Sequence, residues 1–166
     1  MAEITLKGQK THTVGNLPAL HKEVPSFTLV DKDLADRKLE EFRGKKKMVL
    51  TVPSLDTGVC SLMTKRINEF AKKHPDCVFI TVSIDTPFAQ KRFCEAEGVH
   101  NVHTFSTMRH PEFGKAYGVL IGEGPLKGAL ARSLLVLDEK DHVLHVELVS
   151  EITQEPHYDR AFAILE

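Results

Sequence analysis

Two short apolar segments on either side of an amphipathic segment constrain the fold more than any other feature of this chain. They are "MVLTVP" at 48–53 and "CVFITVSI" at 77–84, and both are rich in β-branched residues without alternating polar positions. Runs of this kind are typical of central strands that are covered on both faces. Between them, residues 60–73 carry apolar side chains at helical spacing. A strand, a helix and a strand in this order predict a right-handed parallel crossover.

The other segments extend this unit into a single α/β domain over residues 1–166. Turn residues, strand-forming runs and helix signals predict the following elements: a hairpin around Gly8 in "EITLKGQKTHTV", a short strand in "VPSFTLVDKD", helices over 87–98, 111–117 and 155–165, a shaped glycine-rich loop over 118–133, and a hairpin of strands at 134–137 and 142–149. This order predicts a thioredoxin-like fold with an N-terminal β-hairpin and a central mixed sheet flanked by helices.

Charge and composition exclude several classes of partner. The chain has 22 basic and 23 acidic residues and a net charge of -1, which gives no electrostatic reason to expect nucleic acid or an anionic membrane. Its only basic run, "RGKKK" at 43–47, is predicted to be a solvated loop. No apolar run approaches the roughly 20 residues that span a bilayer. Because "MAEITLKGQK" has no apolar leader segment, we expect a cytoplasmic protein.

The chain has three cysteines, Cys60, Cys77 and Cys94, and no C-x-x-C motif. This number is too small for a disulfide scaffold, and the spacing encodes neither a zinc ribbon nor a thioredoxin-type redox pair. Cys77 begins an apolar strand and is predicted to be a core residue. Cys94 has Gln90 and Lys91 one helical turn before it, so we expect it to be partly exposed.

Cys60 lies where the first helix is predicted to begin. Thr57 precedes it at the spacing of N-cap to N3, and a threonine hydroxyl at the N-cap can accept the N3 amide hydrogen. The unpaired amides of the first turn favour an anion, so a thiolate at this position would be stabilised and nucleophilic. A nearby Asp56 carboxylate would raise the pKa of the thiol, so we expect Asp56 to point away or to cap the helix itself in place of Thr57. A buried structural cysteine is the competing interpretation, and the local sequence leaves both open.

Two further residues stand out near this position. Pro53 ends the first strand where no ladder hydrogen bond is needed. Arg132 is the single charge in "ALARSLLVL", just before a core strand. It is either a charge at a strand edge that faces solvent, or a permanent cation that stabilises a thiolate and the oxygens of a polar substrate.

"PSLDTGVC" resembles the active-site motif of the peroxiredoxins, in which a proline and a threonine precede the reactive cysteine. "DTPFAQKRFCEAEG", "YGVLIGEGPLKGALARS" and "EITQEPHY" are similar to segments of the bacterial thiol peroxidases, an atypical two-cysteine subfamily. The resemblance extends from the N-terminal hairpin to the last helix. It implies the peroxiredoxin type of thioredoxin-like fold.

The resemblance also implies a role for each residue. Cys60 matches the peroxidatic cysteine that becomes a sulfenic acid, and Cys94 matches the resolving cysteine that forms an intrachain disulfide with it. Thr57 matches the threonine that bonds the thiolate and the peroxide. Arg132 matches the arginine that holds both, and Pro53 matches the proline that shields the pocket from water.

The family pattern further implies substrates, partners and context. These are hydrogen peroxide and alkyl or lipid hydroperoxides, thioredoxin as the reductant, a homodimer and a part in antioxidant defence. No metal or organic cofactor is expected, because the sulfur carries the electrons. A Cys60–Cys94 disulfide needs Cα atoms within about 7 Å. Since both cysteines lie in predicted helices, we expect local unwinding during the cycle.

Other kinds of site fit the sequence less well. The histidine pairs His100/His103 and His142/His145 are each three residues apart, which on a strand points them to opposite sides rather than toward one metal. "GEGPLKG" lacks the complete phosphate-loop pattern. A cysteine hydrolase would need a histidine base near Cys60, and the sequence identifies none. A non-catalytic thioredoxin-like binding module would have unreactive thiols.

Overall fold

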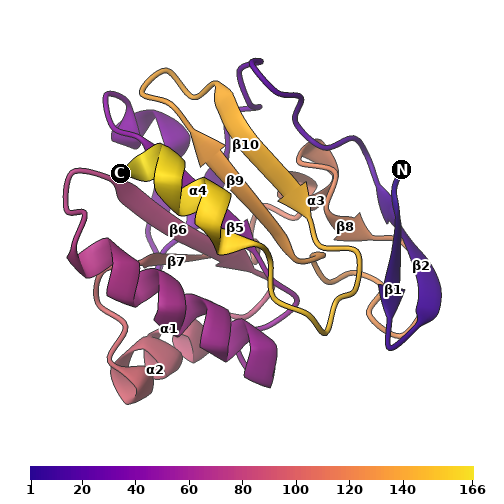
Figure 1. The fold of residues 1–166 in the computed structure, drawn as a ribbon. Coiled ribbons are helices and arrows are strands. Elements are labelled where there is room, and N and C mark those ends of the chain that lie inside the picture. The colour runs from indigo at the N-terminus through magenta and orange to yellow at the C-terminus, as the bar shows by residue number, and fades with distance from the viewer.

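A seven-stranded mixed sheet forms the centre of the computed structural model, which describes residues 1–166 (Figure 1). In sheet order the strands are β10 (Val143–Leu148), β9 (Ser133–Leu137), β5 (Lys47–Thr51), β6 (Val78–Ser83), β7 (His103–Ser106), β3 (Thr28–Val30) and β4 (Asp36–Lys38). The three strands β5, β6 and β7 are parallel, and every other pair is antiparallel. The prediction of a mixed sheet is confirmed.

The predicted crossover joins β5 to β6 through helix α1 (Gly58–Lys72). A second crossover, through α2 (Pro87–Glu97), leads to β7, which the sequence analysis did not predict. β7 has only four residues, "HTFS", and its buried positions include a threonine and a serine, so it gives no clear periodic signal. Gly98 ends α2 in the left-handed conformation with φ 67°, as expected for a glycine at the end of the predicted helix.

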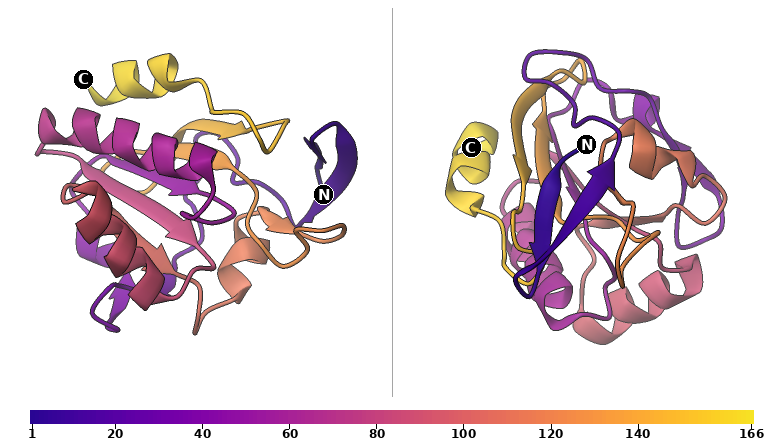
Figure 2. Two further views of the ribbon diagram at one scale, coloured as in Figure 1. Left: turned by 90° about the horizontal axis from the view of Figure 1, so that it is seen from below. Right: turned by 90° about the vertical axis from the view of Figure 1, so that its right-hand side faces the viewer.

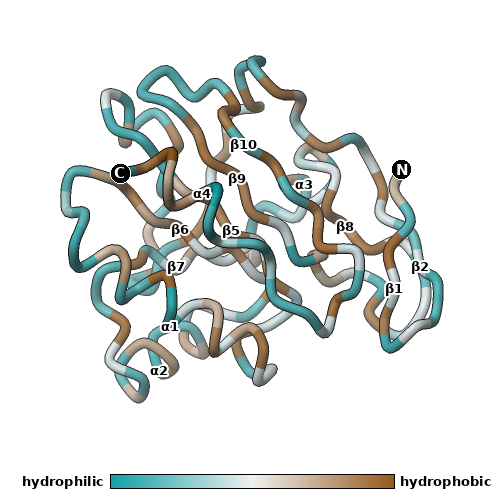
Figure 3. Tube along the Cα trace, viewed as in Figure 1, coloured by the Kyte–Doolittle hydropathy of each residue, from teal (hydrophilic) through white to brown (hydrophobic).

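Helices cover the two faces of the sheet unequally. Helices α1, α2 and α4 (Tyr158–Leu165) enclose one core cluster with β5, β6 and β9, and Figure 2 shows α1 and α4 running beside the sheet. On the other face, α3 (Glu112–Ala116) and the short 3-10 helix η1 (Leu39–Phe42) enclose a second cluster. Figure 3 shows the hydrophobic stretches concentrated along the central strands, as expected for strands buried on both sides.

The predicted N-terminal hairpin is present as β1 (Glu3–Leu6) and β2 (Gln9–Val14), which pair with β8 (Leu120–Ile121) in a small second sheet. Its turn places Lys7 and Gly8 at positive φ, 51° and 81°, as a tight two-residue turn requires. In Figure 2 the hairpin projects from one side of the main sheet. Backbone hydrogen bonds join its Thr5 to Ser150 and Ile152, in the segment after β10.

The hairpin of β9 and β10 is confirmed, but the last helix begins later than predicted. α4 starts at Tyr158 rather than at Glu155. The residues before it make other contacts instead of helical ones: the Glu155 carboxylate accepts the Tyr158 hydroxyl, and the His157 amide donates to Glu147.

The prediction of a solvated loop over 43–47 is wrong for Lys47. This residue begins β5 and its side chain is 0% exposed. Its ammonium lies 2.6 Å from a carboxylate oxygen of Asp141, which is itself 2% exposed, and it donates to the carbonyls of Lys45 and Asp138. Because β9 runs antiparallel beside β5, the turn that joins β9 to β10 meets the start of β5 and supplies Asp138 and Asp141.

Replacement of Lys47 by methionine is expected to lower the free energy of unfolding by about 3–5 kcal/mol, because it leaves the Asp141 carboxylate buried without its cation. The measurement is urea unfolding followed by circular dichroism. The matched control, Lys45→Met at an exposed position, is expected to change stability by no more than about 0.5 kcal/mol. Adding Asp141→Asn to Lys47→Met should recover part of the lost stability. Equal stability of Lys47→Met and Lys45→Met would contradict the interpretation.

Candidate active site

The first turn of α1 carries Cys60 as the spacing predicted. Thr57 is the N-cap, with extended backbone angles (φ -86°, ψ 146°), and its hydroxyl oxygen accepts the Cys60 amide at 3.2 Å. The same hydroxyl donates to the Ser54 carbonyl at 3.2 Å. Asp56 is exposed and does not cap the helix, which agrees with the expectation that its carboxylate points away. Cys60 itself is 0% exposed.

The segment between β5 and α1 is held by a residue that the sequence analysis missed. One oxygen of Asp85 accepts the Ser54 hydroxyl at 2.7 Å, and the other accepts the Leu55 amide at 2.8 Å. Pro53 is buried at the start of this segment. Asp85 follows β6 as Ser54 follows β5, and the carboxyl ends of neighbouring parallel strands lie at one edge of a sheet. This rule on parallel strands could have predicted from the sequence that the residues after β5 lie beside those after β6.

Arg132 is buried against Cys60 and does not face solvent at a strand edge. It is 1% exposed, and its Nη1 lies 3.0 Å from the Cys60 sulfur. Its Nε donates to the Ile152 carbonyl at 2.9 Å. Since β9 is antiparallel to β5, the residue before β9 lies at the edge where β5 ends. The Thr51 hydroxyl donates to the Ala131 carbonyl at 2.7 Å and fixes the backbone beside Arg132.

The Arg132 guanidinium has no carboxylate partner. The partners of its guanidinium are two sulfurs, of Cys60 and Met63, and the carbonyl of Ile152, and none of them is a carboxylate. A buried charge is costly unless an opposite charge lies beside it. A thiolate at Cys60 supplies that charge, with the amides of the first helical turn as further donors. Cys60 is therefore a buried cysteine whose surroundings suit a nucleophile.

The structure contradicts the expectation that Cys94 is partly exposed. Cys94 is 6% exposed, and its sulfur lies 3.7 Å from the Thr104 hydroxyl of β7. The helix is rotated from the predicted orientation, because Gln90 is buried and its amide donates to Ser83 and to the Phe105 carbonyl. Phe88, by contrast, is 67% exposed. Burial raises the pKa of the Cys94 thiol above its ordinary value.

Cys77 is a core residue, as predicted. It lies just before β6, where its sulfur is 3.8 Å from the carbonyl of Leu165 in α4. It is thus near the start of the parallel strands, whereas Cys60 follows the end of one. Burial raises the pKa of the Cys77 thiol. All three cysteines are free thiols in this structure.

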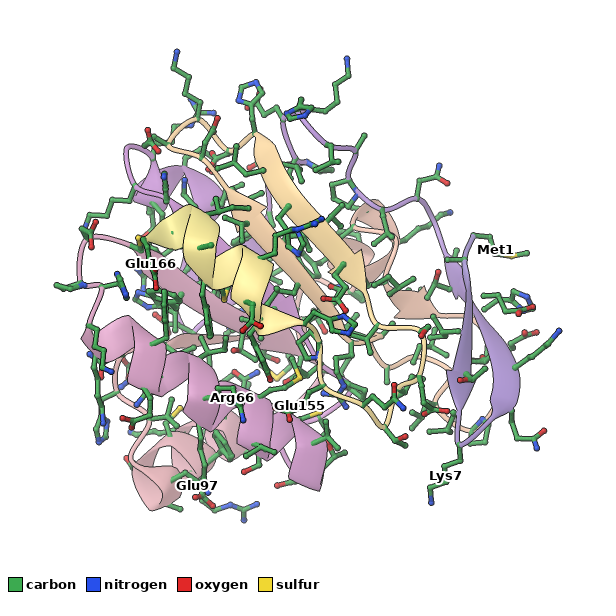
Figure 4. The ribbon with its side chains drawn as sticks, in the orientation of Figure 1. Met1, Lys7, Arg66, Glu97, Glu155 and Glu166 are labelled. Carbon is green, nitrogen blue, oxygen red and sulfur yellow. The ribbon has the colours of Figure 1, made fainter.

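Ties between α1 and its neighbouring helices begin beyond the first turn. Lys65 pairs with Glu97 of α2 at 2.7 Å, and Asn68 accepts the Asn101 amide at 2.8 Å. On the other side Arg66 lies 3.8 Å from Glu155, and Figure 4 shows these two side chains between α1 and the start of α4. The turn that carries Cys60 is held instead by the Thr57 cap, by Arg132 and by the burial of Cys60 in the core.

Two kinds of group are not found at this site. No histidine hydrogen-bonds to Cys60, so the structure offers no base of the kind that a cysteine hydrolase uses. No group of three or more His, Cys, Asp or Glu side chains could hold a metal ion. In addition, none of the helices has the length and hydropathy of a membrane span.

A buried arginine beside a cysteine on the first turn of a helix, at the carboxyl end of a central strand, is the arrangement expected of a thiol-dependent redox protein. The model of the Redoxin family matches residues 19–162. A curated thiol peroxidase from Leptospira interrogans is 44% identical over 165 residues, which are 98% of this chain and 96% of that protein. This protein therefore belongs to the redoxin family, and its recognition as a relative of the bacterial thiol peroxidases is confirmed.

Solved structures agree on the fold. A peroxiredoxin-like protein from Aquifex aeolicus superposes with a TM-score of 0.94 at 39% identity, covering 99% of this chain and 96% of the other. A thiol peroxidase from Chromobacterium violaceum gives a TM-score of 0.92 at 27% identity, covering 98% and 94%. The prediction of a thioredoxin-like fold of the peroxiredoxin type is confirmed.

The burial of Cys94 has a direct consequence for its chemistry. In the folded, reduced protein at pH 8, we expect Cys94 and Cys77 to react with iodoacetamide at least about tenfold more slowly than in urea, because burial restricts access and a raised pKa leaves little thiolate. Alkylation followed by peptide mass spectrometry measures each site separately. A Cys94 rate that is the same in the folded protein and in urea would show that the thiol is accessible.

Glu151 anchors the segment that positions Arg132. Its carboxylate accepts the Thr153 and Gly8 amides, each at 2.9 Å, and the Thr5 hydroxyl at 2.9 Å. These bonds, first among them the one from the Thr153 amide, lower the pKa of Glu151 to about 2. The next residue, Ile152, provides the carbonyl that accepts Arg132 Nε. The carboxylate thus joins the N-terminal hairpin to the backbone beside the site.

The depressed pKa of Glu151 gives a pH dependence of defined sign. Its contribution to stability is complete above its unfolded value near 4.5 and is lost as the pH falls toward about 2. Glu151→Gln should therefore be less stable than the native protein at pH 7, and the difference should narrow steadily below pH 4.5. Urea unfolding at several pH values measures the difference in stability. The control is Glu139→Gln, in the exposed turn between β9 and β10. A difference that stays constant with pH would exclude this role.

Proposed function

We propose that this protein is a thiol peroxidase that reduces hydroperoxides with Cys60 as the reactive thiol. The observation that carries the proposal is the 3.0 Å contact between the buried Arg132 guanidinium and the Cys60 sulfur at the start of α1. Membership of the redoxin family and the similarity to a curated thiol peroxidase support it. Antioxidant defence is the corresponding physiological role.

The first step is attack of the Cys60 thiolate on the terminal oxygen of ROOH. A sulfur–oxygen bond forms and the O–O bond breaks, which gives a sulfenic acid at Cys60 and the alcohol ROH once the leaving oxygen takes up a proton. Negative charge develops on that oxygen in the transition state. The Arg132 guanidinium is already in place beside the sulfur, so it can stabilise this charge without reorganisation.

Thr57 and Pro53 act on the same step in this proposal. The Thr57 hydroxyl now donates to the Ser54 carbonyl and can turn its hydrogen toward a bound peroxide oxygen. Pro53 is buried and has no amide hydrogen, so it lines the approach to Cys60 without adding a donor that would attract water.

Cys94 is proposed to resolve the sulfenic acid. Its thiol attacks the Cys60 sulfur, an intrachain disulfide forms and water leaves. Cys60 lies in the first turn of α1, and Cys94 lies in the later part of α2 against β7. The reaction therefore requires the first turn of α1, α2 or both to unwind locally.

The reductant, the substrate range and the assembly follow from the family pattern and remain predictions. We propose that thioredoxin reduces the disulfide, that hydrogen peroxide and alkyl or lipid hydroperoxides are substrates, and that the protein is a homodimer. No cofactor enters the cycle, because two thiols carry both electrons.

Treatment of the reduced protein with one equivalent of hydrogen peroxide tests the cysteine assignments. We expect a loss of two hydrogens in intact mass and a Cys60–Cys94 crosslink in a non-reducing peptide map. Cys94→Ser should stop at a sulfenic acid that dimedone traps, and Cys60→Ser should consume no peroxide. Cys77→Ala is the matched control and should behave like the native protein. Rapid peroxide consumption by Cys60→Ser would exclude the proposal.

The role of Arg132 is tested separately. Arg132→Lys keeps the charge but not the planar fork, and we expect the rate of Cys60 oxidation by peroxide to fall by about 10²–10³-fold, as for removal of one preorganised donor. Stopped-flow measurement of the first oxidation step gives this rate. As a control for folding, the thermal unfolding midpoint of Arg132→Lys must remain well above the assay temperature. An unchanged oxidation rate would remove Arg132 from the mechanism.

A further inference from the structure

Arg132 has a second sulfur partner in α1. Its Nη1 lies 3.0 Å from the Met63 thioether sulfur as well as 3.0 Å from the Cys60 sulfur. A terminal guanidinium nitrogen carries two hydrogens, so it can donate one to each. Cys60 and Met63 are three residues apart on one helix, which places both on the face that meets Arg132. Met63 is 0% exposed, so water does not compete for this bond.

We propose that Met63 is a positioning residue for the peroxidase reaction, whose thioether accepts one hydrogen of Arg132 and holds the guanidinium against Cys60. Without Met63, the guanidinium would have one fixed partner besides the reactive sulfur, the Ile152 carbonyl at Nε. One hydrogen bond leaves the planar group free to rotate about it. A second acceptor at Nη1 fixes its plane and aims the same nitrogen at Cys60.

A thioether suits this position because it is a neutral and weak acceptor. A carboxylate here would form a strong ion pair with Arg132 and neutralise the charge that the thiolate and the peroxide need. The sulfur also packs within the apolar cluster of Met48, Ile67 and Leu134 without leaving a buried polar group unpaired. Met63 can therefore hold the guanidinium and leave its charge available.

The contact has a consequence over the whole cycle. When Cys60 is oxidised and pairs with Cys94, Arg132 loses its sulfur partner. Met63 and Ile152 still hold the guanidinium, so it is already in place when reduction returns the Cys60 thiolate. This inference rests on the role of Arg132 in the proposed function.

The test is Met63→Leu, which conserves side-chain volume and removes the acceptor. We expect the rate constant for Cys60 oxidation by hydrogen peroxide to fall by about tenfold, which is the effect of one lost hydrogen bond from a charged donor. Met48→Leu is the matched control, since Met48 is a buried methionine of the same cluster that makes no hydrogen bond to Arg132. Its rate should stay within about twofold of the native value.

A double-mutant cycle separates positioning from general packing. In an Arg132→Lys background, Met63→Leu should change the rate by no more than about twofold, because the group that Met63 positions is absent. A packing effect would lower the rate by the same factor in both backgrounds, and that result would overturn the proposal. A Met63→Leu rate equal to that of Met48→Leu would overturn it as well.

A second variant tests the role of Met63 if Met63→Leu folds poorly. Met63→Gln retains an acceptor oxygen at a similar chain length, and we expect it to keep more of the oxidation rate than Met63→Leu; the reverse order would contradict the proposal. Cys60→Ser is measured in parallel. Peroxide consumption by Cys60→Ser would defeat the proposed function itself, whereas full dependence on Cys60 without coupling of Met63 to Arg132 would defeat only the inference about Met63.

Discussion

The contact between the Arg132 guanidinium and the Cys60 sulfur is the interaction on which the site depends. It brings a permanent cation into a dry interior, where charge interactions are stronger than in water and an unpaired charge is costly. The surrounding structure holds Cys60 and Arg132 in place. Thr57 and Asp85 fix the start of α1. Thr51 fixes the backbone before Arg132, and Glu151 fixes the segment whose Ile152 carbonyl accepts the guanidinium.

The two ends of the sheet have different functions. At the end where β5 and β6 stop, backbone and side chains converge on Cys60. At the opposite end, the buried Lys47–Asp141 pair joins the start of β5 to the turn between β9 and β10, and Cys77 packs against the C-terminal residues. Cys60 and Cys77 are thus separated by the length of the strands.

Local patterns predicted much of the fold. The crossover over 48–84 and the hairpin around Gly8 were predicted because each is encoded by contiguous residues with a clear period or turn. The strand β7 was missed because it is short and partly polar. Cys94 and Lys47 were placed in more exposed positions than they occupy, since the burial of each helix or strand face depends on partners that the sequence does not reveal. The Gln90 side-chain nitrogen donates to Ser83 and to the Phe105 carbonyl, and Lys47 pairs with Asp141.

By itself, the sequence determined that Cys60 stands on the first turn of a helix capped by Thr57, because capping and helix start are local properties of a few residues. It left open whether Cys60 is reactive and whether Arg132 faces solvent. Only the tertiary structure decided the position of Arg132, because Arg132 is 72 residues from Cys60 and reaches it through the antiparallel pairing of β9 with β5. The contact of Met63 with Arg132 depends on the same pairing, since sequence spacing relates Met63 to Cys60 on α1 but not to the residue that precedes β9.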